Sequence, residues 1–318
     1  MDIRQLKYFA TVAGHENFSK AAQQLRIAQP ALSRRIRLLE EELGVRLFER
    51  HLRGATLTTE GRALLERAQF LLRSFDQIES DIRAGLGHAG GPVAVGMTPN
   101  FAMMVGAALA REVRATFPEA QLKIVEAYSP DLRDRLMGGS IDIAVLSGSA
   151  PVPAGTIAVE PLFEDRLCLV GPAGDPLLAP LLARGEVAVR QLRGLPLILT
   201  GMSSAGIRNE LEMLASKRRI PLNTVVEVDS IGLATRMIEL GMGYTIYVAS
   251  GVAHDPALAA VPISGLWLQR SLGWPVNRPL SRVASGVLPL VRARLLALVK
   301  SGAWKGARLL RTRRTARA

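Results

Sequence analysis

Cysteine is almost absent from the chain, because Cys168 is the only one among 318 residues. A single thiol cannot form a disulfide within the chain, and a redox switch that needs two cysteines is excluded. Cys168 lies in the alternating run RLCLV, a pattern typical of a buried strand, so we expect a buried structural cysteine. Histidine is also scarce, with only His15, His51, His88 and His254. These histidines lack the spacing of metal ligands, so we expect no metal ion and no cofactor.

Motifs of catalysis are missing as well. The sequence contains no Gly-x-Ser-x-Gly nucleophile turn, no phosphate-binding loop and no dinucleotide-binding fingerprint. No apolar run approaches the length of a membrane span, and a helical pattern follows Met1 directly. We therefore expect no signal peptide, no membrane contact and a cytoplasmic protein. The composition is that of a globular protein of two or three domains, and nothing in it favours an enzyme.

Acidic residues are outnumbered, which gives a formal net charge of +12 and favours an anionic partner. Half of the excess lies after Trp304, in a tail without any acidic residue. Its basic residues are Lys305, Arg308, Arg311, Arg313, Arg314 and Arg317. Such a tail can hold phosphate loosely, but a solvated end is the commoner arrangement. We therefore expect residues 303–318 to be a disordered basic tail.

The most informative segment begins with the run FSKAAQQL, which predicts a short helix. Ser19 can cap this helix, and Ala21, Ala22 and Leu25 give it an apolar face of mostly small residues. Ile27 then fills a tight turn. A second helix is expected directly after that turn.

Pro30 marks the first turn of this second helix, where its fixed φ is suitable and its missing N–H is not needed. The apolar stripe that anchors the helix consists of Leu32, Ile36, Leu39 and Leu43. The side chains that point outward are Gln29, Pro30, Ser33, Arg34 and Arg37. An apolar back and a cationic, hydrogen-bonding front are the layout of a DNA recognition helix. The alternative is an ordinary amphipathic hairpin with solvated arginines.

A basic turn rich in Gly and Thr, RHLRGATLTTEG, begins at Arg50 and suits a two-stranded wing beside the DNA backbone or minor groove. Together, FSKAAQQL, AQPALSRRIRLLEEELGVRLFER and LTTEG resemble the winged helix-turn-helix of the LysR-type transcriptional regulators. This resemblance implies that Gln29, Pro30, Ser33 and Arg34 contact DNA and that Arg53 belongs to the wing. Helical phase and charge add Arg37 and Arg50 to this DNA-binding set.

Residues 59–84 predict one long helix that links the winged domain, residues 1–58, to the rest. Its heptad seam consists of Leu64, Ala68, Leu71, Phe75, Ile78 and Ile82. We expect this seam to join two copies, which could then read two half-sites of a palindromic operator; packing inside its own chain is the alternative. The glycine-rich residues 85–91 predict a hinge. The resemblance further implies a homodimer or homotetramer and RNA polymerase as a partner.

Residues 92–302 alternate between short β runs and helical stretches, which predicts an α/β fold with parallel sheets. The strand candidates are VAVGM, QLKIVEAY, IDIAVLS, LCLVG, LPLILT, TVVEVDS and YTIYVAS. The resemblance implies a periplasmic-binding-protein-like effector domain of two subdomains. Subdomain I comprises residues 92–160 and 267–302, and subdomain II comprises residues 161–266.

Parallel sheets bind ligands at the carboxyl ends of their strands, where small polar residues occur here. The candidates for effector binding are Thr98, Pro99, Asn100, Ser129, Ser147, Thr200, Ser203, Ser230 and Thr245. The resemblance places a small-molecule effector between the subdomains and makes Thr98, Thr200 and Ser203 the best matches. An alternative role for each Ser or Thr is helix capping. Another alternative, for the whole domain, is an enzyme or carrier tethered to a nucleic-acid-binding anchor.

Overall fold

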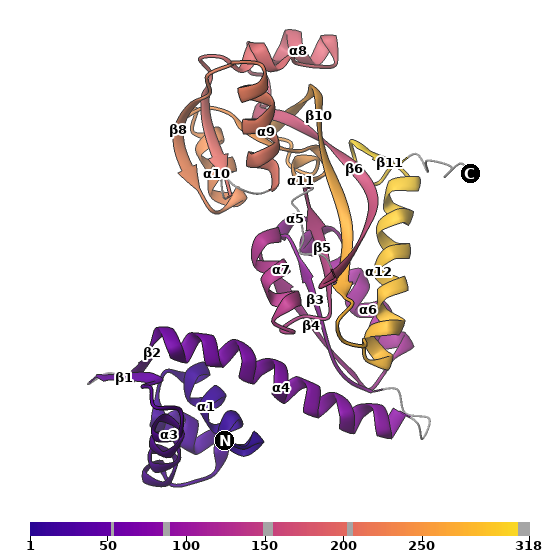
Figure 1. Ribbon diagram of the computed structural model, residues 1–318. Helices are drawn as coiled ribbons and strands as arrows, with labels where there is room; N and C mark the ends of the chain where they lie inside the picture. The colour runs from indigo at the N-terminus through magenta and orange to yellow at the C-terminus, as the bar shows by residue number, and fades with distance from the viewer. Residues whose placement is uncertain (52–53, 85–89, 149–154, 202–205, 311–318) are drawn as a thin grey trace.

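The computed structural model describes residues 1–51, 54–84, 90–148, 155–201 and 206–310, and a long helix joins its two parts (Figure 1). The N-terminal part contains α1 (Ile3–His15), α2 (Phe18–Leu25), α3 (Gln29–Leu43), β1 (Phe48–His51) and β2 (Gly54–Leu57). Strands β1 and β2 pair antiparallel and form the expected wing. The helix-turn-helix and the wing are both confirmed.

The start of α2 differs from the prediction, because Asn17 caps this helix and Ser19 does not. The Asn17 side chain accepts hydrogen bonds from the backbone N–H groups of Ser19 (2.9 Å) and Lys20 (3.0 Å). Asn17 has an extended backbone, which aims its side chain at the first turn, whereas Ser19 already lies inside the helix. At the other end of the motif, Gly44 closes α3 in the left-handed conformation, at φ 69°.

The back of α3 packs into the core of the winged part through Leu32, Ile36 and Leu39, all buried. Leu43, which the sequence placed in the same stripe, is 37% exposed, so the prediction was wrong for this residue. It lies in the last turn, beyond the reach of the core. Phe48 brings the wing into this core, with its ring centroid 5.4 Å from that of Phe9.

The predicted seam of helix α4 (Thr59–Ala84) is covered near the beginning of the helix and exposed further along. Ala68 is completely buried in the core of its own winged part, and Leu64 packs against that core. The prediction that Ala68 contacts a second copy was therefore wrong, because the first turns of α4 complete the winged core. Leu71, Phe75 and Ile78 are 44%, 55% and 59% exposed. The side chain of Ile82 lies outside the described residues.

The C-terminal part is an α/β fold with one seven-stranded sheet and one strand pair. The strands are β3 (Gly91–Met97), β4 (Ala120–Glu126), β5 (Ile143–Ser147), β6 (Ile157–Pro172), β7 (Pro196–Thr200), β8 (Asn223–Val228), β9 (Thr245–Val248), β10 (Leu258–Pro275) and β11 (Ala307–Leu309). Strand β3 pairs parallel with β4 and β5, and β7 pairs parallel with β8. The seven predicted strands and the α/β class are confirmed. The sequence did not show how long β6 and β10 are.

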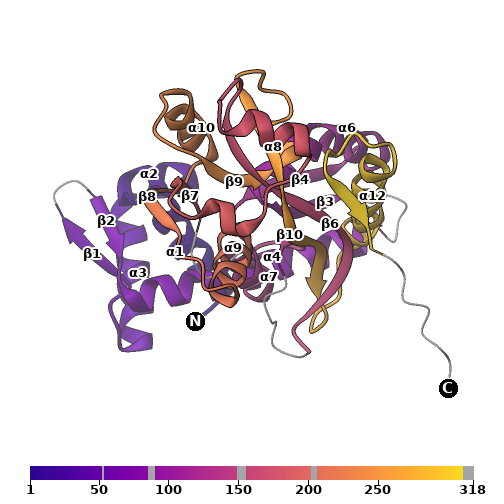
Figure 2. The same ribbon diagram turned by 90° about the horizontal axis from the view of Figure 1, so that it is seen from above.

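Helices cover these sheets, as two perpendicular views show (Figures 1 and 2). The helices are α5 (Pro99–Phe101), a π-helical turn (Ala102–Gly106), α6 (Ala107–Thr116), α7 (Ser129–Met137), α8 (Leu178–Arg184), a 3₁₀ turn (Val189–Leu192), α9 (Gly206–Lys217), α10 (Ile231–Glu239), α11 (Ala249–Val252) and α12 (Arg282–Lys300). The antiparallel pair β6 and β10 runs from one end of this part to the other. These two strands therefore connect both halves of the α/β part.

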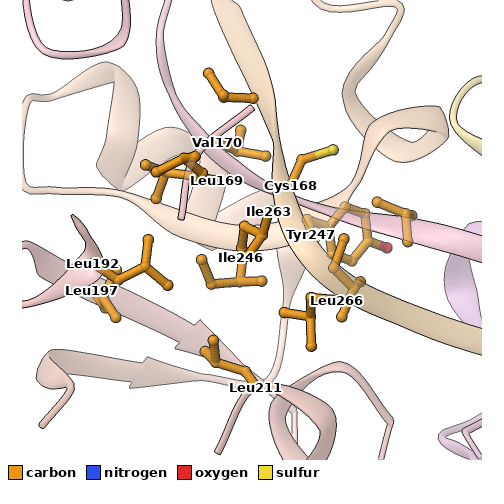
Figure 3. Packing of buried hydrophobic residues seen from close by; sticks show 14 of the residues in the cluster. Cys168, Leu169, Val170, Leu192, Leu197, Leu211, Ile246, Tyr247, Ile263 and Leu266 are labelled. Carbon is orange, nitrogen blue, oxygen red and sulfur yellow. The ribbon is translucent and has the colours of Figure 1, made fainter. Parts of the chain in front are cut away.

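Each half has its own hydrophobic core. One core contains Val95, Phe101 and Phe163, and α12 covers it. The other contains Leu197, Ile246 and further residues around Cys168 (Figure 3). Cys168 is buried as expected, and burial raises the pKa of its thiol to about 12, so a reactive thiolate does not form at neutral pH.

Helix α4 also contacts the α/β part. The guanidinium of Arg278 lies over the Phe70 ring at 5.9 Å and pairs with Asp142 at 3.3 Å. The same ring lies against Gly139, where a Cβ atom would come within 2.1 Å of the Phe70 ring. Glycine therefore permits this close approach between the long helix and the end of α7.

The segment after α12 differs most from the prediction, because residues 303–310 are not a disordered tail. Trp304 is buried against Phe101 and Phe163, with ring centroids 5.0 Å and 5.3 Å away. Its indole Nε1 donates to the Asp165 carboxylate at 3.0 Å. Strand β11 then pairs with the edge of β6. Basic composition suggested solvation, but one aromatic residue anchors the segment. Residues 311–318 lie outside the described residues.

We expect Trp304→Ala to destabilise the α/β part by about 3–5 kcal/mol, because it removes a large buried ring. Trp304→Phe keeps an aromatic ring and loses the bond to Asp165, so its cost is expected to be clearly smaller. Urea unfolding of the full-length variants measures both values. If both variants have the wild-type free energy of unfolding, Trp304 does not anchor this segment.

Candidate DNA-binding face and ligand pocket

The outward face of α3 and the wing form a shallow groove. Five of the seven residues predicted to bind DNA line this groove: Pro30, Ser33, Arg34, Arg37 and Arg50. Gln29 begins α3 and donates from its Nε2 to Ser33 Oγ at 2.9 Å. Arg53 lies outside the described residues. The sequence analysis missed Arg46, which lines the same groove; a cation in the turn between helix and wing was the available signal.

The cations of this groove are exposed, and none forms an ion pair within the described residues. They are Arg34, Arg37, Arg46 and Arg50. Arg50 is the only one of them held by a ring, since its guanidinium lies 4.4 Å from the Phe18 centroid. Guanidinium groups without a carboxylate partner are free to bind phosphate or base edges.

The acidic residue Glu40 positions the wing and does not neutralise these cations. Its Oε1 accepts from the backbone N–H groups of Leu47 (2.8 Å) and Phe48 (3.2 Å). Thr58 holds the other end of the wing, because its hydroxyl donates to the Arg46 carbonyl at 2.7 Å. Helix and wing are therefore fixed relative to each other through short polar contacts.

A cavity of about 270 Å³ lies where the two halves of the α/β part meet. Seven of the nine predicted effector residues line it: Thr98, Pro99, Asn100, Ser129, Ser147, Thr200 and Ser230. They follow or end β3, β4, β5, β7 and β8, so the cavity lies at the carboxyl ends of these strands. Ser203 lies outside the described residues.

Thr245 does not line the cavity, so this prediction was wrong. It is completely buried at the beginning of β9, where it pairs with Val170 of β6. The cavity lies toward the other end of that strand, where Tyr247 lines it. Thr245 begins β9, so the rule that ligands bind at the carboxyl ends of strands already argued against it.

Most of the serines and threonines in the cavity are not helix caps. Ser230 caps α10 by accepting from the backbone N–H of Leu233 at 3.4 Å. Ser129 instead accepts from the backbone N–H of Ser147 at 2.8 Å. Thr98 precedes α5 without forming a side-chain cap. These last two hydroxyl groups are available to a ligand.

Arg270 is the main cavity residue that the sequence analysis missed. It is buried on β10, its Nε and Nη2 donate to Asp165 Oδ2 at 3.2 and 2.8 Å, and its Nη1 donates to Ser147 Oγ. Its guanidinium also lies 4.9 Å from the Phe101 ring centroid. An arginine inside the otherwise strand-like run WLQRSLGW was the signal that could have identified it.

Two hydrogen bonds donated by residues of the cavity lining join the halves. Asn100 Nδ2 donates to Ser250 Oγ at 3.3 Å, and the Tyr128 hydroxyl donates to the backbone carbonyl of Asp229. Burial and the nearby Asp229 raise the pKa of Tyr128, so its hydroxyl remains a donor. The halves are therefore held close together around the cavity.

Among the described residues, no group of three or more His, Cys, Asp or Glu side chains is arranged to hold a metal ion. In the same residues, no helix has the length and hydropathy that crossing a membrane requires.

Comparisons with known proteins cover both parts of the chain. A model of the bacterial regulatory helix-turn-helix proteins of the lysR family matches residues 3–62, and a model of the LysR substrate binding domain matches residues 86–296. The transcriptional regulator BbuR of Bordetella bronchiseptica is 31% identical over 312 residues, which cover 96% of this chain and 94% of the relative. The nitrogen assimilation regulatory protein nac of Klebsiella aerogenes is 30% identical over 305 residues, with coverages of 94% and 95%.

Solved structures show the same architecture. CbnR, a LysR family transcriptional regulator, matches with a TM-score of 0.69 at 22% identity and covers 92% of this chain and 99% of its own. A full-length OxyR variant from Pseudomonas aeruginosa matches with a TM-score of 0.68 at 24% identity, with coverages of 92% and 95%. From both family models and from relatives that match over nearly the whole length, we conclude that the chain belongs to the LysR family of bacterial transcriptional regulators.

Proposed function

We propose that the chain binds an operator in double-stranded DNA as a homo-oligomer and controls transcription in response to a small molecule in the cavity. The DNA-binding part of this proposal rests on one observation. The exposed face of α3 and β1 carries guanidinium groups that lack carboxylate partners. A CbnR structure in complex with its target DNA, which matches with a TM-score of 0.68, supports this placement. Because the operator is cytoplasmic in a bacterium, the proposed site of action is the cytoplasm.

The proposed second copy binds along α4. Leu71, Phe75 and Ile78 form an exposed apolar surface, and Met1 and Ile3, at the start of the chain, line the same groove. Exposed apolar side chains at helical spacing are typical of a helix that packs on another helix. A dimer formed in this way can present two recognition helices to a palindromic operator. Association into a homotetramer and contact with RNA polymerase are further parts of the proposal.

In this proposal the cavity binds its ligand without converting it, and no metal ion or cofactor takes part. The described lining contains neither histidine nor cysteine, and its serines bond to backbone N–H groups or to arginine. The two carboxylates of this lining, Glu126 and Asp229, form no hydrogen bond to a serine or threonine hydroxyl within the described residues, so no hydroxyl there is paired with a general base. The hydrogen bonds that join the two halves give the ligand a way to change their relative position.

Replacing Arg34 with Ala is expected to weaken operator binding by roughly 1–3 kcal/mol and to relax sequence preference, because this residue faces base edges. Arg50→Ala removes a contact with the DNA backbone and should weaken binding more evenly across sequences. The same result is expected for Arg53→Ala. The operator is obtained by selection from random duplexes, and affinities are measured at one salt concentration.

Arg35→Ala is the matched control, because its guanidinium lies over the Tyr8 ring at 5.9 Å and does not line the groove. It should leave operator affinity unchanged. Equal losses for Arg34→Ala and Arg35→Ala would contradict the assignment of the groove.

Placing Asp at both Leu71 and Phe75 is expected to convert the dimer into a monomer, because an interface there would bury unpaired charges. Sedimentation of the full-length chain measures this change. Gln69→Asp is the control, since it adds a charge two residues away on the opposite side of α4. A double variant that sediments like the wild type would show that α4 does not form the interface.

A ligand of the cavity and the operator should influence each other reciprocally. The cavity ligand is recognised in a thermal-shift screen of metabolites as a compound that stabilises the wild type but not Thr98→Val. If it changes operator affinity by some factor, operator must change its affinity by the same factor. Calorimetric titrations with and without operator measure both factors. If operator leaves the affinity of the ligand unchanged, the two sites are not coupled through affinity, and this part of the proposed mechanism is contradicted.

A further inference from the structure

The buried end of the cavity is rich in hydrogen-bond donors. A guanidinium group carries five N–H bonds, and Arg270 uses three of them on Asp165 and Ser147, so two remain. Ser147 and Ser129 use their oxygen atoms as acceptors, which leaves each hydroxyl hydrogen free to donate. Thr98 adds a hydroxyl that forms no hydrogen bond within the described residues. This end therefore fits an acceptor group such as a carboxylate.

The exposed rim of the cavity has the opposite character. Glu126 is the last residue of β4 in one half, and Asp229 directly follows β8 in the other half. Both residues are exposed, and neither carboxylate has a hydrogen bond or ion pair within the described residues. Two free carboxylates on either side of an opening form a site for a cationic donor such as an ammonium group.

The charge of the whole lining excludes a strongly anionic ligand. Arg270 is already neutralised by Asp165, so Glu126 and Asp229 leave an excess of two negative charges. Residues 149–154 (SAPVPA) and 202–205 (MSSA), which lie outside the described residues, contain no ionisable side chain. A dicarboxylate would place its second charge near the rim, where like charges repel.

Between the two ends, the walls are mainly apolar. Ile207, Ile231 and the rings of Tyr128 and Tyr247 line this part. The volume of about 270 Å³ corresponds to about nine water molecules, which suits a short carbon chain.

We propose that the effector is a zwitterion, with one carboxylate bound by Arg270, Ser147 and Ser129 and one ammonium group bound between Glu126 and Asp229. This assignment rests on the proposed function, because it names the ligand of the same cavity. The ammonium group would contact both halves of the α/β part at once. It thereby stabilises the arrangement in which the Tyr128 hydroxyl reaches the Asp229 carbonyl.

The test uses the full-length protein and two sets of compounds matched in chain length. The four-carbon set contains 2-aminobutyrate, 4-aminobutyrate, butyrate, butylammonium and succinate; the six-carbon set contains the corresponding amino acids, monocarboxylate, amine and dicarboxylate. Affinities are measured by ligand-observed nuclear magnetic resonance. In at least one set, an amino acid should bind about fivefold or more tightly than its deaminated partner, because two carboxylates attract its ammonium group. The dicarboxylate should bind most weakly.

Two variants connect this preference to the rim. In Glu126→Gln and Asp229→Asn, the preference for the amino acid should fall toward onefold, while butyrate or hexanoate binds as before. Asp131→Asn is the matched control, because Asp131 is exposed on α7 of the same half and does not line the cavity. This control should retain the full preference, and all three variants should keep the wild-type melting temperature.

The possible failures are distinguishable. If deaminated acids or dicarboxylates bind as tightly as the amino acids in both sets, or if no amino acid binds, the zwitterion assignment is overturned. Operator binding by the same preparation tests the proposed function separately. A protein that binds operator but shows no preference for amino acids loses only the ligand class, whereas one that binds no operator loses the regulatory function.

Discussion

The Asp165 carboxylate is the group on which the α/β part depends most. It lies in the interior and accepts from Arg270 on β10 and from Trp304 after α12. A buried charge is tolerated only when it is paired and hydrogen-bonded. Separating Asp165 from Arg270 and Trp304 would leave a buried charge without partners, and this free-energy penalty keeps the three residues together. Arg270 in turn bonds to Ser147 at the end of β5. The ion pair of Asp165 and Arg270 therefore connects a wall of the cavity, the long strands β6 and β10 and the C-terminal segment at a single point.

A second set of contacts connects the DNA-binding part with the rest. The first turns of α4 complete the winged core, and Phe70 further along packs on Gly139 and Arg278. The helix thus belongs to both parts, and its apolar residues Leu71, Phe75 and Ile78 remain exposed. Contacts with the two parts overlap along the helix, because Phe70 lies between Ala68 and Leu72 of the winged core.

The sequence predicted the elements that depend on residues close together in the chain, and it missed the contacts between residues that are far apart in the chain. The helix-turn-helix, the wing and seven strands follow from spacing and propensity over a few residues. By contrast, Asp165 is separated from Arg270 by 105 positions and from Trp304 by 139. No local pattern records such pairings, so the buried arginine and the anchored C-terminal segment were missed. Ala68 was misassigned for a related reason, since a heptad pattern shows that a face is apolar but not what covers it.

The pairing of β6 with β10 is irregular in two places, between Pro262 and Trp267 and between Arg270 and Ser271. The first irregularity is the larger. Four residues of β10, 263–266, lie opposite Leu167 alone, between the pairs Pro262–Cys168 and Trp267–Arg166. Such a break disrupts the ladder and lets the strand bend, and Gly265 within it adopts φ 73°. The second irregularity lies where the two strands pass from one core, at Leu268, to the other, at Leu272. A rotation of one half against the other would bend both strands at this passage, so that a displacement of an ångström at the cavity would become a larger sweep at the far ends of the molecule.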